Sequence, residues 1–351
     1  MDLSKITIRA MRDGEQKKIQ QIGKRAFQFV EALFVGRPQE AMAAEYEGRL
    51  VGGILYKEFT VHQKRIAYID EAFVDPDYQG MGIGKKLYTE TIEALWKQNY
   101  HVLTALVKDD NVGSWKPFLD NGFCRVSVYR IIKEIGIGGF LKHYLLTPYL
   151  IAVGMDFYMC SRENTLEEKG NAPLQLFLYF FVNYLLLFPL WARWYHRNAD
   201  SFLWSFLAYG TILALFIGSR YLGTLISRND GKFRFNQGGS FLLPLLGFFG
   251  NVFFMNANWY PKCYENTDDF RKKLAIPEII KWFLFAFLPW TALLPGPYFQ
   301  ALGRLSCPFL IFIMIPVYPF EIFGGGRIYR YKKLLWLVMF IITIAECFLI
   351  F

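Results

Sequence analysis

The residues best suited to chemistry form a glycine-rich turn at positions 79–85, which reads Gln-Gly-Met-Gly-Ile-Gly-Lys. A strand pattern ends just before this turn, and a helix pattern begins within it. Glycines let backbone N–H groups approach an anion closely, and a helix N-terminus adds a partial positive charge. The turn therefore predicts a pyrophosphate cradle. A P-loop is excluded, because its Gly-Lys-Ser/Thr sequence is absent.

Alternating strand and helix patterns surround this turn within the first 160 residues. Apolar alternation predicts strands at 3–12, 101–107, 124–134 and 154–162, and an antiparallel meander over 45–76. Apolar residues at helical spacing predict helices at 13–27, 85–99 and 114–123. The turn thus joins the end of the meander to a helix, which is where a phosphate-binding loop would be placed.

A second motif distinguishes a functional loop from a purely structural turn. The residues that fit Asn-x-x-Ala/Ser-x-x-x-Tyr/Phe-x-x-x-Gly-Phe are Asn111, Ser114, Phe118, Gly122 and Phe123. In the turn itself, Gln/Arg-x-x-Gly-x-Gly/Ala is matched by Gln79, Gly82 and Gly84. With both motifs in this order, residues 3–162 resemble the GCN5-related N-acetyltransferases (GNAT). The resemblance implies an α+β domain with a splayed mixed sheet flanked by helices.

The resemblance also implies a cofactor site. Acetyl-CoA would be the acetyl donor and would lie along the sheet as an extra strand, and no metal is expected. The backbone of Phe73 and Val74 would bond the pantetheine and the acetyl carbonyl, and Asn111 and Ser114 would lie near the cofactor. Pyrophosphate would be held by the amides of Gln79, Gly80, Met81, Gly82, Ile83, Gly84 and Lys85.

Acetyl transfer to an amine needs a base, because a lysine amine has an ordinary pKa well above 7. Asp70 and Glu71, late on the strand before the turn, are the candidates. Strand side chains alternate, so the two are expected to point to opposite faces and at most one to line the cleft. We favour Glu71 as the base; a solvated carboxylate pair is the alternative.

Two features depart from the family pattern. The tyrosine that usually protonates the leaving thiolate aligns with Phe118, which has no proton to donate. Either Tyr129 or water replaces it, or the thiolate leaves unaided, or turnover is slow. Residues 134–153 form an apolar insertion before the last strand. This insertion is either a lid on the sheet or an amphipathic segment at a bilayer interface.

The second half of the chain predicts an all-α polytopic membrane domain. Of the 351 residues, 54% are hydrophobic and 19% aromatic, and the long apolar runs lie beyond residue 173. The net charge of +9 divides into +2 for residues 1–165 and +7 for residues 166–351. We therefore expect a GNAT domain at 1–162, a polar linker at 163–173 and a membrane domain at 174–351.

The basic residues decide between two membrane topologies. The apolar segments lie near 174–192, 201–218, 239–258, 282–295, 303–320 and 334–351. Acetyl-CoA would place the N-terminal domain in the cytosol, and six simple spans would then leave 11 Lys and Arg outside against 5 inside. If 239–258 dips in and returns, 13 lie inside and 3 outside, as the positive-inside rule requires. The sequence therefore predicts five spans and one re-entrant segment.

Residues 220–330 resemble the site-2 protease family of intramembrane metalloproteases. The similar stretches are 228–249, 256–262 and 318–329. The expected HExxH window falls at Arg220–Thr224, and the later aspartate aligns with Gly324, so zinc ligands are missing. The resemblance therefore implies a proteolytically inactive scaffold. A generic membrane sequence with a glycine turn is the alternative.

The leading interpretation is an integral membrane N-acetyltransferase whose GNAT domain faces the cytosol and acetylates a primary amine. Its partners would be the lipid bilayer, an amine acceptor of unidentified type and a membrane protein. The alternative is an acetyl-CoA-binding regulatory protein on an inactive protease-like scaffold. Nucleic-acid binding is not expected, since the N-terminal half carries a net charge of only +2. Five scattered cysteines without CxxC spacing indicate a reducing compartment and no zinc site.

Overall fold

The computed structural model separates the chain into two compact units. It describes residues 3–27, 29–108, 112–147, 153–166, 171–228, 231–236, 238–261, 265, 267–317 and 320–350, without the side chains of 3, 29–30 and 112–115. The first unit comprises residues 1–148 and 156–168, and the second comprises 149–155 and 169–351. Each unit is therefore treated separately.

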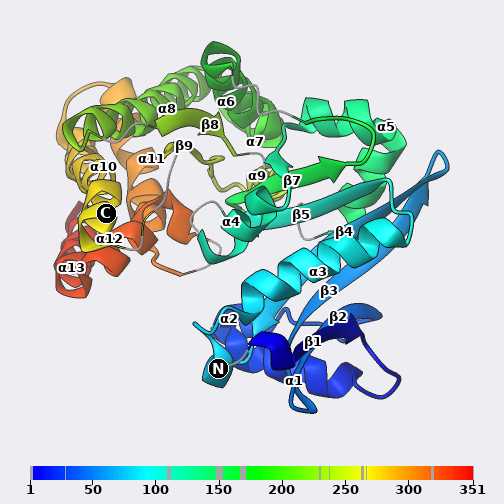
Figure 1. Ribbon diagram of the computed structural model, residues 1–351. Coiled ribbons are helices and arrows are strands. Elements are labelled where there is room, and N and C mark those ends of the chain that lie inside the picture. Colours follow the sequence, from blue (N-terminus) through cyan, green and yellow to red (C-terminus); the bar gives the residue numbers. More distant parts are fainter. Residues whose placement is uncertain are drawn as a thin grey trace. The chain divides into compact units, whose positions relative to one another are not determined.

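A mixed sheet of seven strands forms the centre of the first unit. Its order is β1-β2-β3-β4-β5-β7-β6, with β4 and β5 parallel. The strands are β1 (Ile6–Ala10), β2 (Glu40–Tyr46), β3 (Arg49–Val61), β4 (Lys64–Val74), β5 (Val102–Lys108), β6 (Cys124–Arg125) and β7 (Met155–Ser161). Figure 1 shows β3 and β4 as a long paired ribbon. The expected meander is therefore present, and its first turn uses positive φ at Glu47 (47°) and Gly48 (78°).

Helices flank this sheet. They are η1 (Leu3–Lys5), α1 (Gln16–Ala26), α2 (Phe29–Ala32), η2 (Pro76–Tyr78), α3 (Ile83–Lys97), α4 (Val112–Asp120) and α5 (Val128–Leu146). Consecutive residues of β4 contact different helices, since the Phe73 ring lies against Gly23 of α1 and Val74 lies near Gly84 of α3. Because strand side chains alternate, α1 and α3 cover opposite faces of the sheet.

The strand expected at 124–134 is wrong. Only Cys124 and Arg125 pair with β7, and α5 begins at Val128 after Ser127 accepts a hydrogen bond from the Arg130 N–H. The β-branched residues favoured a strand, but Val128, Ile131 and Ile135 also recur at helical spacing, and Ile131 and Ile135 are buried.

The insertion at 134–153 is mostly the continuation of α5, which is kinked at Gly136 where φ is +72°. On its inner side, the buried His143 bonds Thr104 of β5 at 2.8 Å and contacts the Phe59 ring. Its other side exposes an apolar row, Ile137, Leu141 and Leu145. The helix thus packs on the sheet as a lid would, and its contact with a bilayer stays a prediction.

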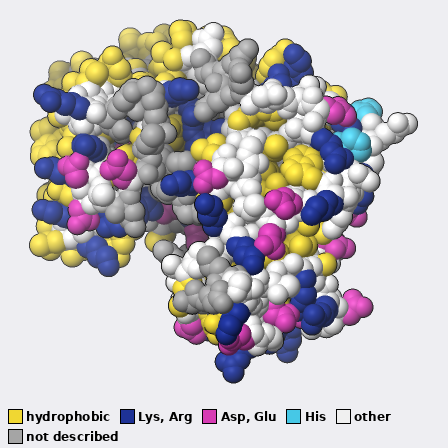
Figure 2. Space-filling model, in the orientation of Figure 1, with side chains coloured by type: hydrophobic (Ala, Val, Ile, Leu, Met, Phe, Trp, Pro, Cys, Tyr) yellow, Lys and Arg dark blue, Asp and Glu magenta, His cyan; other side chains and the backbone are white. Residues whose placement is uncertain are grey.

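The second unit is largely helical. Its elements are α6 (Ala172–Leu186), α7 (Phe188–Arg197), α8 (Ala199–Ile226), β8 (Gly231–Phe235), α9 (Leu242–Phe248), β9 (Ala257–Pro261), α10 (Asp268–Ala286), η4 (Pro289–Leu293), α11 (Pro297–Met314), η5 (Glu321–Phe323), α12 (Gly325–Tyr331) and α13 (Lys333–Ile350). Three described helical segments are long and apolar enough to cross a membrane: α8, α13 and Asp268–Leu293. The pair α6–α7, bent by 55°, would make a fourth. Figure 2 shows hydrophobic side chains gathered over this unit's surface.

The expectation that the second unit is all-α is wrong. Strands β8 and β9 pair as an antiparallel ribbon from Gly231↔Pro261 to Phe235↔Ala257. The segment 239–258, expected to be re-entrant, is broken rather than continuous. It contains the seven residues of α9, followed by irregular backbone from Asn251 to Asn256 that leads into β9. Such backbone is tolerated at membrane depth only where protein or a wet cavity covers it. Here Val252–Met255 are buried in the aromatic core of the unit.

Candidate functional site

The glycine-rich turn between η2 and α3 presents its backbone at the surface. Gly80 and Gly82 have φ values of +76° and +83°, which glycine adopts without a steric penalty. Gly82 is the N-cap of α3, and no side chain caps this helix end. The first backbone N–H groups of a helix lack intrahelical partners, so this end is electropositive. Gly80, Met81, Gly82 and Lys85 are exposed, whereas Ile83 is buried and anchors the turn.

Polar contacts fix the approach to this turn. The buried Asp75 accepts a hydrogen bond from the Asp77 N–H at 3.1 Å, and Arg25 of α1 pairs with both carboxylates at 3.1 Å. The Gln79 amide donates to the Val74 carbonyl at 3.0 Å. A carbonyl accepts two hydrogen bonds, so this contact leaves the Val74 oxygen one further site. The turn is therefore held from both β4 and α1. Arg25 had no signal in the local sequence.

The parallel ladder between β4 and β5 ends before β4 does. Its last partners are Ile69 and Ala105, although β4 continues to Val74 and β5 to Lys108. On its other edge β4 stays paired with β3 as far as Gly52↔Val74. The two strands therefore part next to the glycine-rich turn. The backbone edge of β4 around Phe73 and Val74, which the resemblance assigns to a cofactor, lies where the ladder with β5 has ended.

A bulge in β4 changes the expected arrangement of the two candidate bases. Leu55 pairs with Glu71 and Tyr56 with Ile69, so Asp70 is the extra residue. Strict alternation, on which the opposite-face prediction rested, does not hold at a bulge. Asp70 bonds Lys57 at 2.6 Å, whereas no hydrogen-bond partner for Glu71 Oε2 is present among the described residues. Asp70 thus forms a salt bridge with Lys57, a residue that the sequence had not indicated.

The carboxyl group of Glu71 is electrostatically unusual. Burial is the main cause that raises its pKa to about 8; the neighbouring Asp70 adds to the rise, and Lys57 opposes it. A carboxyl with a pKa near neutrality is suited to general acid–base work, and such shifts cluster at functional sites. Of the two candidates, the structure thus distinguishes Glu71 by its environment.

Two other candidate positions, Tyr129 and Phe118, lie in contrasting surroundings. Tyr129 lies in the first turn of α5 and is 75% exposed, so the structure gives its hydroxyl no buried position. Phe118 is buried, with its ring 5.0 Å from that of Tyr88 and 4.9 Å from that of Phe123. Asn111 lies outside the described residues, and the side chain of Ser114, on α4, is not described.

His143 is a buried polar residue of the first unit that neither motif includes. Its ring packs against Phe157, Tyr68 and Phe59, with centroids 4.5–5.7 Å apart. Burial lowers the pKa of this imidazole to about 3, so it is neutral at physiological pH. Its bond to Thr104 ties α5 to β5. We interpret it as a core histidine.

The second unit contains a fully buried cluster of ionic side chains. Glu278 of α10 accepts bonds from Arg220 of α8 at 3.1 Å and from Arg327 of α12 at 3.2 Å, and it also bonds Lys281. Arg220 donates further to Asn256 Oδ1 at 2.6 Å and to backbone carbonyls. Three cations therefore converge on one carboxylate. We call these four residues, Arg220, Glu278, Lys281 and Arg327, the ionic cluster.

No metal-binding group is apparent in the described part of the chain, since nowhere in it do three or more His, Cys, Asp or Glu side chains come together. Gly324, where the resemblance to site-2 proteases would place an aspartate, lies beside the ionic cluster. A Cβ at this glycine would lie 2.7 Å from Glu278 Oε2 and from Lys281 Nζ. The HExxH window at Arg220 and the aspartate position thus do come together, around a salt-bridge network.

Comparisons with known proteins concern the first unit. Residues 8–123 match the model of the Acetyltransferase (GNAT) family, which confirms a GNAT domain in this part of the chain. No curated protein sequence matches the chain. The family match does not extend to the second unit, so the site-2 protease resemblance stays a prediction.

Solved structures similar to this chain include several acetyltransferases. The Escherichia coli ribosomal-protein-S18-alanine N-acetyltransferase is 17% identical, with a TM-score of 0.32, covering 47% of this chain and 97% of its own. N-acetylglutamate synthase from Neisseria gonorrhoeae, complexed with coenzyme A and N-acetyl-glutamate, is 19% identical, with a TM-score of 0.32. The match covers 44% of this chain and 35% of the synthase chain. An aminoglycoside acetyltransferase from an uncultured soil metagenomic sample is 22% identical, with a TM-score of 0.26. The match covers 34% of this chain and 86% of the acetyltransferase chain. At these values the likeness carries no argument about substrate.

Proposed function

We propose that this protein is a membrane-anchored N-acetyltransferase that transfers acetyl from acetyl-CoA to a primary amine at the cytosolic face. The observation that carries the proposal is the arrangement at the end of β4. The glycine-rich turn with an uncapped helix N-terminus follows this strand, and β5 no longer pairs with the last residues of β4. Glu71, whose pKa is raised, lies on the same stretch of β4. The family match over 8–123 supports the same activity.

The residues of the turn fit acetyl-CoA. Its pyrophosphate would be held by the backbone N–H groups of Gly82 to Lys85 at the uncapped end of α3, where the helix dipole favours an anion. The pantetheine would lie along the backbone of Phe73 and Val74. When bound, acetyl-CoA supplies an acetyl group activated as a thioester.

Glu71 would take the proton from the attacking amine nitrogen as that nitrogen bonds the acetyl carbon and the carbon–sulfur bond breaks. Backbone N–H groups of β4 would polarise the acetyl oxygen. No tyrosine hydroxyl is available at position 118, so the thiolate would leave unaided or take its proton from water. Positioning of the two substrates supplies the rest of the rate acceleration.

Membrane anchoring is the second part of the proposal. It is supported by three helical segments long enough to span a bilayer, by the bent α6–α7 pair and by the +7 charge of residues 166–351. We retain five spans with a re-entrant segment at 239–258, a linker at 163–173 and an N-terminal domain in the cytosol. The broken backbone between α9 and β9 supports the re-entrant segment.

A second candidate function is an acetyl-CoA-binding regulatory protein, with partner recognition by an inactive protease-like scaffold. Two observations favour it. Phe118 is packed among aromatic rings at the position where the GNAT resemblance expects a proton donor. The ionic cluster includes Arg220 and lies beside Gly324, the two positions where the site-2 protease resemblance expects zinc ligands. In this alternative the turn binds acetyl-CoA, and no amine is acetylated.

An assay of acetyl transfer separates the two candidates. Detergent-purified full-length protein would be incubated with radiolabelled acetyl-CoA and a panel of small-molecule amines, peptide N-termini and lysine peptides. We expect labelled product with at least one amine class. Saturable acetyl-CoA binding without transfer to any amine would leave the regulatory alternative, and the absence of binding would contradict both.

Gly82→Glu is expected to abolish acetyl-CoA binding in an isothermal titration at concentrations that saturate the wild type. The substitution forces a side chain into left-handed backbone, at a cost of about 1–2 kcal/mol, and places a carboxylate at the pyrophosphate site. Gly48→Glu is the matched control, because Gly48 has a similar φ of +78° in the β2–β3 turn. Equal loss of binding in both variants would mean that backbone strain, not the anion site, is responsible.

A further inference from the structure

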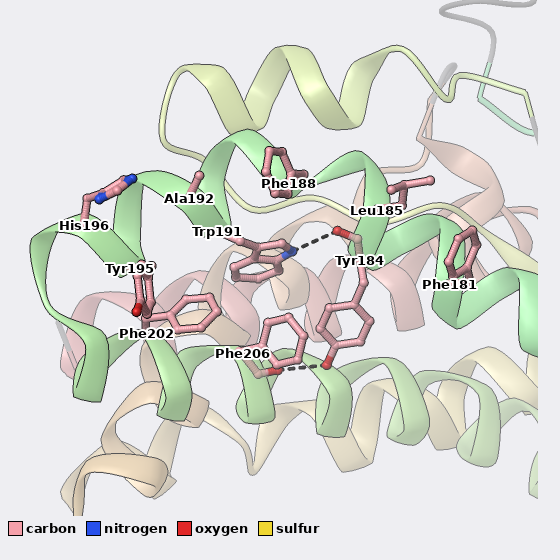
Figure 3. Close-up of a pocket in the computed structure, with 10 residues that line it drawn as sticks. All are labelled: Phe181, Tyr184, Leu185, Phe188, Trp191, Ala192, Tyr195, His196, Phe202 and Phe206. Atoms are coloured by element: carbon pink, nitrogen blue, oxygen red, sulfur yellow. Dashed lines mark hydrogen bonds between the residues drawn. The ribbon is translucent and has the colours of Figure 1, made fainter.

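An apolar groove lies in the second unit along α6, α7 and the start of α8 (Figure 3). Its volume is about 550 Å³, within the roughly 300–1,000 Å³ that small-molecule sites usually have. Seven of its ten lining residues are Phe, Tyr or Trp. The lining consists of Phe181, Tyr184, Leu185, Phe188, Trp191, Ala192, Tyr195, His196, Phe202 and Phe206.

Hydrogen bonds and ring contacts hold the groove open. The bend of 55° between α6 and α7 separates the helices that form its sides. At its base, the Trp191 indole donates to the Tyr184 carbonyl at 3.0 Å, and the Tyr184 hydroxyl donates to the Phe206 carbonyl at 2.8 Å. The Trp191 ring is buried and lies 5.5 Å from that of Phe206. Because these two hydrogen bonds fix its floor, the groove is a formed site rather than a gap between mobile side chains.

The sides of the groove are apolar and accessible. Phe181, Leu185 and Phe188 are 49%, 54% and 66% exposed, so a ligand can enter from the surface of the unit. Such a concave apolar surface suits a flexible hydrocarbon chain. It is too apolar for a charged metabolite, since its lining carries few polar atoms beyond the His196 ring at one end.

The second half of α7, which contributes His196 to the lining, also carries two arginines. Arg193, His196 and Arg197, in the second half of α7, are all exposed, and Asp200 in the first turn of α8 is the nearby acidic residue in sequence. The Arg193 guanidinium also makes a 3.5 Å contact with the Phe248 carbonyl. Two arginines and one aspartate leave a net positive charge, which complements a phosphate.

We propose that the groove binds one acyl chain of an anionic phospholipid, with its phosphate at Arg197, His196 and Arg193. The hydrocarbon would lie from Ala192 towards Phe181 over the Trp191 indole. This inference rests on the proposed membrane location of the second unit and is independent of acetyl transfer. The site would hold a lipid more tightly than the convex helix surfaces around it, since a concave site contacts the chain on several sides.

Photocrosslinking tests the proposal. The full chain in detergent would be mixed with photoactivatable phosphatidylglycerol or phosphatidylcholine, irradiated and mapped by mass spectrometry. We expect phosphatidylglycerol adducts on residues 181–206 in excess over phosphatidylcholine adducts. Ala192→Trp, which fills the groove, is expected to reduce them at least tenfold. Phe188→Asp, on an exposed side, is expected to do the same without disturbing the packed floor.

Two controls complete the design. Ile341→Trp adds the same bulk to α13 at a position 58% exposed and is expected to leave the adducts unchanged. The double variant Arg193→Gln/Arg197→Gln is expected to lower phosphatidylglycerol labelling to the phosphatidylcholine level. Unchanged labelling in Ala192→Trp and Phe188→Asp, or equal labelling by both lipids in the wild type, would overturn the proposal. Membrane fractionation is scored separately: a chain that is soluble without detergent would instead contradict the membrane anchor.

Discussion

Glu71→Gln is expected to lower kcat for acetyl transfer by about 10²–10⁴-fold while leaving the affinity for acetyl-CoA unchanged, because a general base contributes on that order. The wild-type kcat/KM is expected to rise with pH through a limb near pH 8. The pKa of Glu71 is raised to about 8, chiefly by burial, so its carboxyl becomes a base only as the pH approaches that value. The glutamine variant should lack this limb in a pH–rate profile.

Asp70→Asn is the matched control for the Glu71→Gln variant. Its carboxylate pairs with Lys57 and is one cause of the raised pKa of Glu71. Removing the Asp70 charge is expected to preserve activity and move the limb to lower pH. Since the amine substrate also titrates, the profile is measured with two amines of different pKa, and the enzyme's limb should stay fixed. If Asp70→Asn abolished transfer and Glu71→Gln did not, the roles would be reversed.

Stability gives a readout that needs no amine substrate. Unfolded Glu71 ionises near its ordinary value of 4.5, whereas the folded protein keeps this proton until about pH 8. Between these values the folded state binds more protons, so the contribution of Glu71 to the free energy of unfolding falls as pH rises. Glu71→Gln removes that contribution. We therefore expect its denaturant midpoint to decline less between pH 5 and 8 than that of the wild type.

Glu278→Ala is expected to destabilise the second unit by about 3–5 kcal/mol, the usual cost of breaking a buried ion pair. The substitution leaves Arg220, Lys281 and Arg327 buried without their shared carboxylate. Because these residues belong to α8, α10 and α12, the packing of all three helices depends on it. Thermal unfolding in detergent, followed by tryptophan fluorescence, measures the loss.

Two further variants show whether loss of the ionic cluster itself causes the destabilisation expected for Glu278→Ala. Asp269→Ala, on the same helix, removes an exposed pair with Lys273 and is expected to have little effect. Gly324→Ala keeps every charge but brings a Cβ within 2.7 Å of Glu278 Oε2 and Lys281 Nζ, at a φ of +134°. It is therefore expected to destabilise as well. Wild-type stability in Glu278→Ala would show that the cluster contributes no net free energy to folding.

Local sequence determined the features that depend on few neighbouring residues. The Glu47–Gly48 turn, the meander and the start of α3 follow from short-range rules: glycine accepts positive φ, and apolar spacing of 2 or 3.6 residues selects strand or helix. The same rules were ambiguous at 124–134, where β-branched residues fit either period. There the hydrogen bond that caps the helix at Ser127 and the burial of Ile131 decided for a helix.

The tertiary structure decided what depends on residues far apart in the chain. The bulge at Asp70 and its bond to Lys57 need β3 and β4 in one register, and the raised pKa of Glu71 needs the burial that packing creates. The ionic cluster likewise joins residues 220, 278 and 327, whose spacing no local pattern encodes. Composition and charge thus indicated a membrane half, and the glycine spacing at 79–85 indicated an anion-binding turn. Long-range contacts decided that Asp70 pairs with Lys57, that Glu71 Oε2 has no hydrogen-bond partner among the described residues, and that Glu278 binds three cations.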